Sequence, residues 1–322
     1  MRYVDVFNGD ADGICALLQL RLEHPCVSEL VTGVKRDIDL LRRVRAGDGD
    51  RITVLDVSME KNREDLDRLL ANGARVFYAD HHFSGEVPQH PNLQSLINTA
   101  PEVCTSLLIN GHLRGAHAAW AVVGAFGDNL GASARALAAT IDMDGAALAA
   151  AENLGNYINY NGYGPSLEDL HFAPDALFER LRSFADPAGF MAGDREAFTR
   201  LEDGFRSDMA AAAAIQPLRA TASSAVYLLP DEAWARRVSG VFSNDLVNQY
   251  PERAHAVLTD IGGGDLLVSV RAPLARRTGA DEICRQFPTG GGRKAAAGIN
   301  RLPGGDLERF MEVFGGYYAT GT

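Results

Sequence analysis

The chain has 322 residues, of which 46% are hydrophobic and 23% are charged, and its formal net charge is −11. This length allows two domains with buried cores, and the composition is typical of a globular protein in water. The excess of acidic residues argues against a protein that tracks long nucleic acid, because such proteins usually present a basic surface. It favours a small phosphorylated ligand instead.

The sequence shows no feature of an exported or membrane protein. It begins without the apolar segment of a signal peptide, and no apolar run reaches the length of a membrane span. The cysteines lack CxxC spacing, which predicts reduced thiols in the cytoplasm rather than a zinc–thiolate site. They are Cys15, Cys26, Cys104 and Cys284.

The first 125 residues alternate apolar runs typical of strands with amphipathic helical patterns. The predicted strands are residues 3–7, 29–34, 51–55 and 74–78. The predicted helices are residues 14–22, 38–44 and 62–70. Strands that alternate with helices indicate a parallel sheet covered on both faces.

The rest of the chain divides into a helical region and a second α/β region. Residues 104–184 have mainly helical patterns. The polar stretch 153–164 is either a helix end beside an active site or a surface connection, and we favour the surface connection. Residues 195–215 predict one helix that ends at Gln216-Pro217. Further strands are expected at residues 225–229, 254–259, 266–270 and 296–299, with helices at 244–250 and 281–287. We therefore predict a domain at residues 1–190, a helical linker at 191–218 and a smaller α/β domain at 219–322.

The segment after the first predicted strand carries an unusual density of oxygen ligands. It reads Asn8-Gly9-Asp10-Ala11-Asp12-Gly13. Residues two apart in an extended segment project from the same face, so Asn8, Asp10 and Asp12 should point toward one place. Gly13 then lets the chain turn into the following helix.

Three more acidic motifs follow in order along the chain. Asp56 follows the third predicted strand, Asp80-His81-His82 follows the fourth, and Asp128 follows an apolar helical stretch. Each motif alone is more often a turn or a helix cap. Together they predict a site at the carboxyl ends of parallel strands, where ligands bind in such sheets. Carboxylates with an imidazole suit divalent ions, and the imidazole shifts the preference from magnesium toward manganese, cobalt or zinc.

Two basic segments are candidates for binding phosphate. Thr289 is followed by three glycines, Gly290, Gly291 and Gly292, and then by Arg293-Lys294. A glycine run allows backbone N–H groups to approach an anion, and an arginine can bind phosphate through two hydrogen bonds, although a flexible turn is the commoner meaning. Arg271 follows residues 266–270 and is a further candidate. The pair Lys35-Arg36 follows the second predicted strand and is more often a solvated pair than a phosphate contact.

These motifs resemble those of the DHH-superfamily phosphoesterases, and the glycine segment resembles the GGGH motif of the DHHA1 domain that often accompanies them. The resemblance implies that Asp10 and Asp56 hold one metal ion. It implies that the other ion is held by Asp12, Asp56, His81 and Asp128. Asp80 would orient a histidine, and His82 would face the substrate phosphate. We expect His82 and Arg293 to be catalytic by neutralising the charge that develops on the phosphoryl oxygens. Two residues depart from the pattern: Asn8 stands where relatives have His or Asp, and Arg293 stands where they have His.

The resemblance implies a cytoplasmic, metal-dependent phosphodiesterase with two divalent ions, for which manganese is expected and cobalt or magnesium are alternatives. Its expected substrates are short oligonucleotides or dinucleotides, such as pGpG, cyclic di-GMP or nanoRNA, cleaved to nucleoside monophosphates by metal-activated water. We expect neither long nucleic acid nor membrane as a partner, and a homodimer is compatible with the sequence. The alternatives are an exopolyphosphatase, a single-strand exonuclease, or a nucleotide sensor in which Asn8 marks a decayed site.

Overall fold

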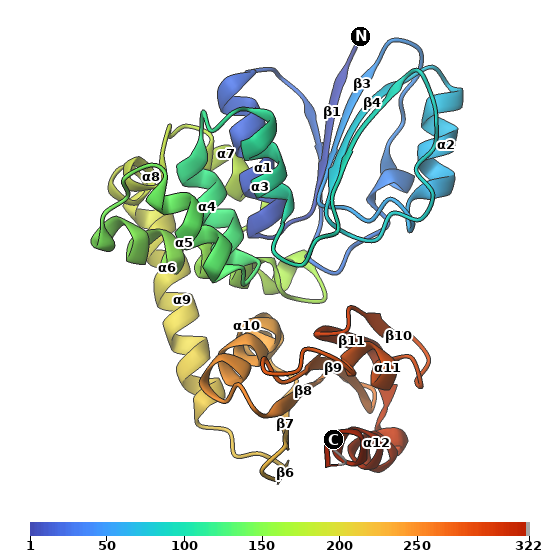
Figure 1. Cartoon of the computed structure of the whole chain (residues 1–322), viewed down its shortest axis with the longest axis vertical. Coiled ribbons are helices and arrows are strands. Elements are labelled where there is room, and N and C mark those ends of the chain that lie inside the picture. The colour runs from blue at the N-terminus through green and yellow to red at the C-terminus, as the bar shows by residue number, and fades with distance from the viewer. Residues whose placement is uncertain (320–322) are drawn as a thin grey trace. The chain divides into compact units, whose positions relative to one another are not determined.

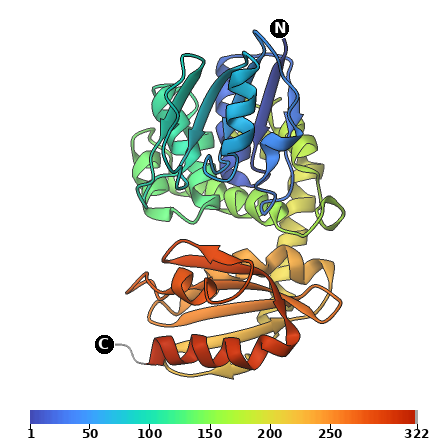
Figure 2. The same cartoon turned by 90° about the vertical axis from the view of Figure 1, so that its right-hand side faces the viewer.

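The computed structural model describes residues 1–319 and contains two compact units, one comprising Met1–Asp203 and one beginning at Gly204. Figure 1 shows the elements of each unit, and Figure 2 shows them after a quarter turn. The division falls within helix α9 (Arg195–Ala213), inside the segment 191–218 for which the sequence predicts a linker. Across residues 1–319, every helix is too short or too polar to cross a membrane.

The first unit is built on a five-stranded sheet in which all neighbouring strands are parallel. Its strands lie in the order β2-β1-β3-β4-β5. Their bounds are Tyr3–Phe7 (β1), Glu29–Val31 (β2), Arg51–Leu55 (β3), Arg75–Asp80 (β4) and Leu93–Ile97 (β5). The predicted parallel α/β fold is confirmed. We did not predict β5, because its partly exposed residues include the polar pair Gln94-Ser95 and lack the apolar pattern of the inner strands.

Helices cover both faces of this sheet (Figure 1). On one side lie α1 (Ala11–Glu23), α3 (Thr105–His112), α4 (Ala118–Gly127) and α6 (Gly145–Gly162), and on the other α2 (Arg63–Ala71). The helix predicted at residues 38–44 is wrong, because only the 3₁₀ turn Leu40–Arg43 forms there. The Asn62 side chain accepts a hydrogen bond from the Leu41 N–H and donates one to the Ile38 carbonyl, in place of helical bonds.

The structure also differs from the prediction for the polar stretch 153–164. It is not a surface connection, because residues up to Gly162 form the second half of α6, where Asn159 and Asn161 are buried. The Asn161 amide donates to the Phe172 carbonyl (2.8 Å) and accepts from the Phe172 N–H (3.0 Å). Asn161 can be buried because the backbone of Phe172, 11 residues further along the chain, satisfies its amide, and the Lys35 ammonium donates to Asn159. The remaining helices of this unit are α5 (Gly131–Ala139), α7 (Pro174–Leu181) and α8 (Pro187–Gly193).

A buried ion pair fastens α1 to the strand before it. Asp5 in β1 is fully buried and accepts from the Arg21 guanidinium at Nε (2.7 Å) and Nη2 (2.5 Å). The hydroxyl of Ser28 donates to the same carboxylate at 2.6 Å. This two-pronged contact sets the position of α1, whose first turn carries part of the acidic motif.

The second unit has a six-stranded sheet in the order β10-β11-β9-β8-β7-β6, in which β7 and β8 are parallel and the other neighbours antiparallel. Its strands are Arg219–Ala220 (β6), Ser224–Leu229 (β7), Ala254–Asp260 (β8), Asp265–Arg271 (β9), Gly290–Gly292 (β10) and Ala296–Pro303 (β11). Its helices are α10 (Ala233–Gln249), α11 (Ala280–Cys284) and α12 (Leu307–Ala319). The predicted second α/β region is therefore confirmed as a mixed sheet with helices.

A buried histidine should make the stability of the second unit depend on pH. His255 in β8 is fully buried, and this burial, with the charge of the nearby Arg253, lowers its pKa to about 4. The unfolded chain, with a histidine pKa near ~6.5, binds more protons between these values. The free energy of unfolding should therefore fall as the pH drops below 6.5, by about 2 kcal/mol at pH 5.

His255→Phe should remove this part of the pH dependence. We would compare urea unfolding of the two proteins at pH 7.5 and pH 5, in a Trp120→Phe background so that Trp234 reports on the second unit. The same loss of stability in both proteins would contradict the assignment to His255.

Candidate metal centre

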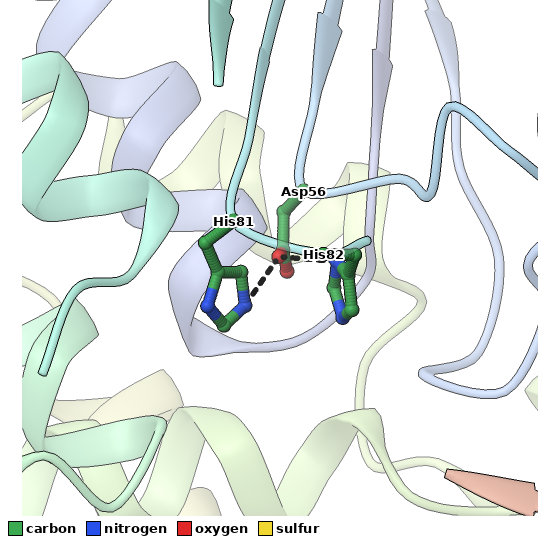
Figure 3. Close-up of side chains that lie close together, drawn as sticks. All are labelled: Asp56, His81 and His82. Atoms are coloured by element: carbon green, nitrogen blue, oxygen red, sulfur yellow. Dashed lines mark ion pairs between the residues drawn. The ribbon is translucent and has the colours of Figure 1, made fainter. Parts of the chain in front are cut away.

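The acidic motifs meet at the carboxyl ends of the central strands. Asn8 follows β1, Asp56 follows β3 and Asp80 ends β4, while Asp12 lies in the first turn of α1 and Asp128 caps the end of α4. Figure 3 shows that the side chains of three residues, Asp56, His81 and His82, point toward one another. These three could ligate one ion, because each offers a ligand atom within 4.8 Å of the others'.

His81 is oriented as a ligand. Its Nδ1 lies 3.0 Å from the Val103 carbonyl, which can only accept, so this nitrogen carries the hydrogen. The other ring nitrogen, Nε2, faces carboxylate oxygens of Asp56 at 3.4 Å, Asp128 at 3.8 Å and Asp12 at 4.0 Å. Metal-binding histidines typically donate one N–H to a carbonyl in this way and bind the ion with the other nitrogen.

Asp56 is held in a costly backbone conformation. Its φ of 58° is in the left-handed region, which few residues other than glycine adopt. Its N–H donates to the Ala79 carbonyl at 3.1 Å, and its carboxylate accepts from the Thr105 hydroxyl at 3.3 Å. Such conformations concentrate at functional sites, where the surrounding structure imposes them. Here the turn directs the carboxylate toward His81.

Asp12 also serves a structural purpose. Its carboxylate oxygens accept hydrogen bonds from the N–H groups of Thr105 and Ser106, each at 2.7 Å, and so cap the N-terminus of α3. Each oxygen keeps a further lone pair, so this contact leaves Asp12 able to ligate an ion. The cap brings α3, and with it Thr105, to the edge of the centre.

Asp10 forms an ion pair with Lys35, which was not among the predicted site residues. The Lys35 ammonium donates to Asp10 Oδ2 at 2.5 Å and to Asn159 Oδ1 at 3.0 Å. The reading of Lys35 as a solvated residue is therefore wrong, although its place after β2 was a signal for the same sheet edge. Asp10 also accepts from the Gly13 N–H at 3.1 Å. A Cβ at Gly13 would lie 2.3 Å from the Asn8 carbonyl oxygen, so this tight turn requires glycine.

His82 has a different environment from His81. Its Nδ1 donates to Asp80 Oδ1 at 2.7 Å, and its side chain is 36% exposed, whereas that of His81 is 3% exposed. Burial lowers the pKa of His82, but the hydrogen bond and charge of Asp80 outweigh it, so its pKa is raised. Asp80 thus contacts a histidine, as the resemblance implies, and that histidine is His82.

The electrostatics favour a bound cation. Burial, followed by the charges of Asp10 and Asp12, raises the pKa of Asp56 well above its usual value, and burial likewise raises the pKa of Asp12. Burial alone would raise the pKa of Asp10 as well, but Lys35 lowers it. Asp12 and Asp56 therefore strongly resist carrying their negative charges unless positive charge is added near them.

Unsatisfied acceptor atoms support the same conclusion. The buried oxygens Asn8 Oδ1, Asp80 Oδ2 and Asp128 Oδ2 have no hydrogen-bond partner within residues 1–319. Buried polar atoms rarely lack partners, and in a centre of this kind an unlocated ion or water is the usual partner. The residues fit divalent metal ions with mixed oxygen and nitrogen ligands, such as manganese.

The predicted phosphate-binding residues lie in the second unit. Gly290, Gly291 and Gly292 are not a loop: they form β10, which pairs with β11 in an antiparallel hairpin whose exposed turn carries Arg293 and Lys294. A Cβ at Gly290 would lie 1.8 Å from the Cys284 carbonyl oxygen, so packing alone requires this glycine. Arg271 ends β9, and its Nε donates to Asn244 Oδ1 at 2.7 Å. The roles assigned to these residues remain predictions.

Neutralising the centre should stabilise the metal-free protein. Asp56→Asn removes a buried charge that burial and its neighbours disfavour, so with a chelator present the variant should melt several degrees above the wild type. Manganese should raise the melting temperature of the wild type and leave that of the variant nearly unchanged. Scanning calorimetry with and without manganese measures both effects, with Asp67→Asn as the control because Asp67 is exposed on α2. If manganese raised the melting temperature of Asp56→Asn as much as that of the wild type, this assignment would be contradicted.

Comparisons with known proteins identify the fold. No protein-family model matches the sequence, and no curated protein matches it. A manganese-bound exonuclease RecJ has a TM-score of 0.63 and 19% identity, over 100% of this chain and 91% of that one. RecJ from Thermus thermophilus with Mn²⁺ has a TM-score of 0.60 and 19% identity, over 99% of this chain and 52% of that one.

A third solved structure resembles this chain along the whole length of both proteins. PggH, a pGpG-specific phosphodiesterase from Vibrio cholerae, has a TM-score of 0.55 and 14% identity, over 100% of each chain. At these identities the likeness concerns the fold. The chain therefore has the same fold as RecJ and PggH, in agreement with the α/β fold that the resemblance of its motifs implies.

Proposed function

We propose that the chain is a metal-dependent phosphodiesterase that cleaves dinucleotides or short oligonucleotides, such as pGpG, cyclic di-GMP or nanoRNA, to nucleoside monophosphates. The observation that carries the proposal is the convergence of buried carboxylates on Nε2 of His81 at the end of the parallel sheet. This set of ligands suits hydrolysis of phosphate esters, which are anionic and need positive charge near the scissile bond.

The ligand residues are those near His81 Nε2 and those near Asp10. Asp12, Asp56, His81 and Asp128 would hold one ion, and Asp10, Asp56 and Asn8 are the donors for the second ion that the motifs predict. Manganese is the proposed ion because an imidazole joins the oxygen donors. A bound ion of this class lowers the pKa of its water and polarises the phosphoryl oxygen.

His82 is placed to contact the substrate. Asp80 fixes its Nδ1, and its half-exposed ring leaves Nε2 to donate to a phosphoryl oxygen. Since Asp80 raises the pKa of His82, the ring carries a proton and a positive charge over a wider pH range than an ordinary histidine. We assign to His82 the neutralisation of charge that develops on the phosphate, and to Asp80 the orientation of His82.

We assign substrate binding to residues of the second unit. Arg293 and Lys294 stand exposed at the β10–β11 turn beside the strand Gly290–Gly292. An exposed guanidinium can bind phosphate or the edge of a guanine base through two hydrogen bonds. Arg271 is a further proposed contact.

Two observations bear on the substrate and point to different relatives. PggH matches this chain along the full length of both, which supports a dinucleotide. RecJ has the higher TM-score, which supports a single-strand exonuclease as the second candidate. The net charge of −11 favours the dinucleotide, because long nucleic acid is bound mainly through basic residues. An exopolyphosphatase and a nucleotide sensor are weaker candidates, the latter resting on Asn8.

Product analysis tests the proposed activity. With manganese, pGpG and other short oligonucleotides should be converted to nucleoside monophosphates, faster than long single-stranded DNA or polyphosphate. Asp56→Asn should lower kcat by at least about 10³-fold while the fold remains intact by circular dichroism, since a ligand is lost. Chromatography of the products separates the candidates. If nucleoside monophosphates were released faster from long DNA than from pGpG, the exonuclease would be favoured. If no substrate gave more product than it gives with Asp56→Asn, the sensor would be favoured.

Arg293 tests the role of the second unit. Arg293→Ala should raise KM for pGpG at least about tenfold, because a charged hydrogen bond to the far half of the substrate is lost. It should change KM for a small chromogenic phosphodiester much less. Arg285→Ala is the control, because Arg285 is an exposed arginine of the same unit. Equal changes for both substrates would mean that Arg293 does not recognise the second half of a dinucleotide.

A further inference from the structure

Lys35 contacts Asp10, one of the donors expected for the second ion. Its ammonium contacts Asp10 Oδ2 at 2.5 Å and Asn159 Oδ1 at 3.0 Å, and lies 5.3 Å from the centre of the Tyr163 ring. The Lys35 side chain is only 22% exposed. One carboxylate oxygen, an amide oxygen and an aromatic face are the surroundings of a bound cation.

The backbone also holds Lys35 in this position. Its N–H donates to the Gly162 carbonyl at 2.8 Å, and its carbonyl accepts from the Asn8 amide at 3.3 Å. Asn8 and α6 therefore anchor the main chain of the residue whose side chain reaches Asp10. This ammonium is built into the fold and is not a surface lysine that happens to lie nearby.

The two groups of donors differ in what they offer an ion. Around His81 Nε2 lie three carboxylates within 4.0 Å, and one of them, Asp128, has an unsatisfied buried oxygen. Around Asp10, the carboxylate accepts from Lys35 and from Gly13, Asp56 would be shared with the ion at His81, and the other donor, Asn8, is a neutral amide. An ion at Asp10 would also lie beside the ammonium and be repelled by it.

We propose that the Lys35 ammonium takes the place of one metal ion, so that the centre binds a single divalent ion per chain, at Asp12, Asp56, His81 and Asp128. The neutral Asn8 and Lys35 act together. Asn8 carries no charge to hold the second ion, and the Lys35 ammonium supplies the positive charge that this ion would have supplied. Lys35 then supplies a permanent positive charge at the side of the centre where a second ion is expected. This inference rests on the proposed metal centre.

The number of bound ions tests the inference without measuring activity. The full-length protein is freed of metal with a chelator and titrated with manganese alone in a calorimeter, and the bound manganese is counted by elemental analysis after gel filtration. We expect one ion per chain. Electron paramagnetic resonance should show the spectrum of an isolated ion, without the spin coupling of two ions about 3.5–4 Å apart. Two ions per chain with a coupled spectrum would overturn the inference.

Variants test whether Lys35 is the cause. Asn8→Asp combined with Lys35→Ala restores a charged ligand and removes the ammonium, so this protein should bind two ions with a coupled spectrum. Lys35→Arg keeps the charge and should bind one, as should the exposed-lysine control Lys61→Ala. Circular dichroism confirms that each variant is folded. If the folded double variant still binds one ion, Lys35 does not exclude the second and the inference fails.

The same titration separates this inference from the proposed function. A wild-type chain that binds no manganese would refute the metal centre itself. A chain that binds two ions and hydrolyses pGpG would retain the proposed function and refute only the replacement by Lys35.

Discussion

The structure of the first unit depends on one electrostatic constraint: several carboxylates must be buried together without destroying the fold. Asp10, Asp12 and Asp56 are almost fully buried, and buried like charges raise one another's pKa and oppose folding. The chain compensates in three ways that use different residues. Backbone N–H groups of α3 bind Asp12, the ammonium of Lys35 binds Asp10, and the ligand set around His81 is left for a cation.

The parallel sheet makes this concentration of charge geometrically possible. Its strands end at one edge, so residues that are far apart in sequence meet where the backbone leaves β1, β3 and β4. The helices are positioned from the same edge. Asp10 and Asp12 start α1, Asp12 caps α3, and α4 ends at Asp128. The site therefore forms part of the connections between strands and helices, and its residues support the fold as well as the chemistry.

Charge also distinguishes the two histidines that follow β4. His81 is buried, donates to the Val103 carbonyl and presents a bare nitrogen to carboxylates, as a ligand does. His82 is half-exposed and pairs with Asp80, which raises its pKa and suits contact with a phosphate oxygen. Adjacent residues of the same type thus have different environments, because Nδ1 of one faces a carbonyl and Nδ1 of the other a carboxylate.

The sequence alone determined the parallel sheet of the first unit, the second α/β region and the gathering of Asp56, His81 and the other acids, because strand periodicity and the position of motifs after strands are local properties. Only the tertiary structure decided the environments. The glycines at 290–292 form a strand because β11 pairs with them, Asn159 is buried because α6 packs at the site, and Lys35 faces Asp10 because β2 lies beside β1. Each of these depends on contacts between distant segments, which no local pattern records.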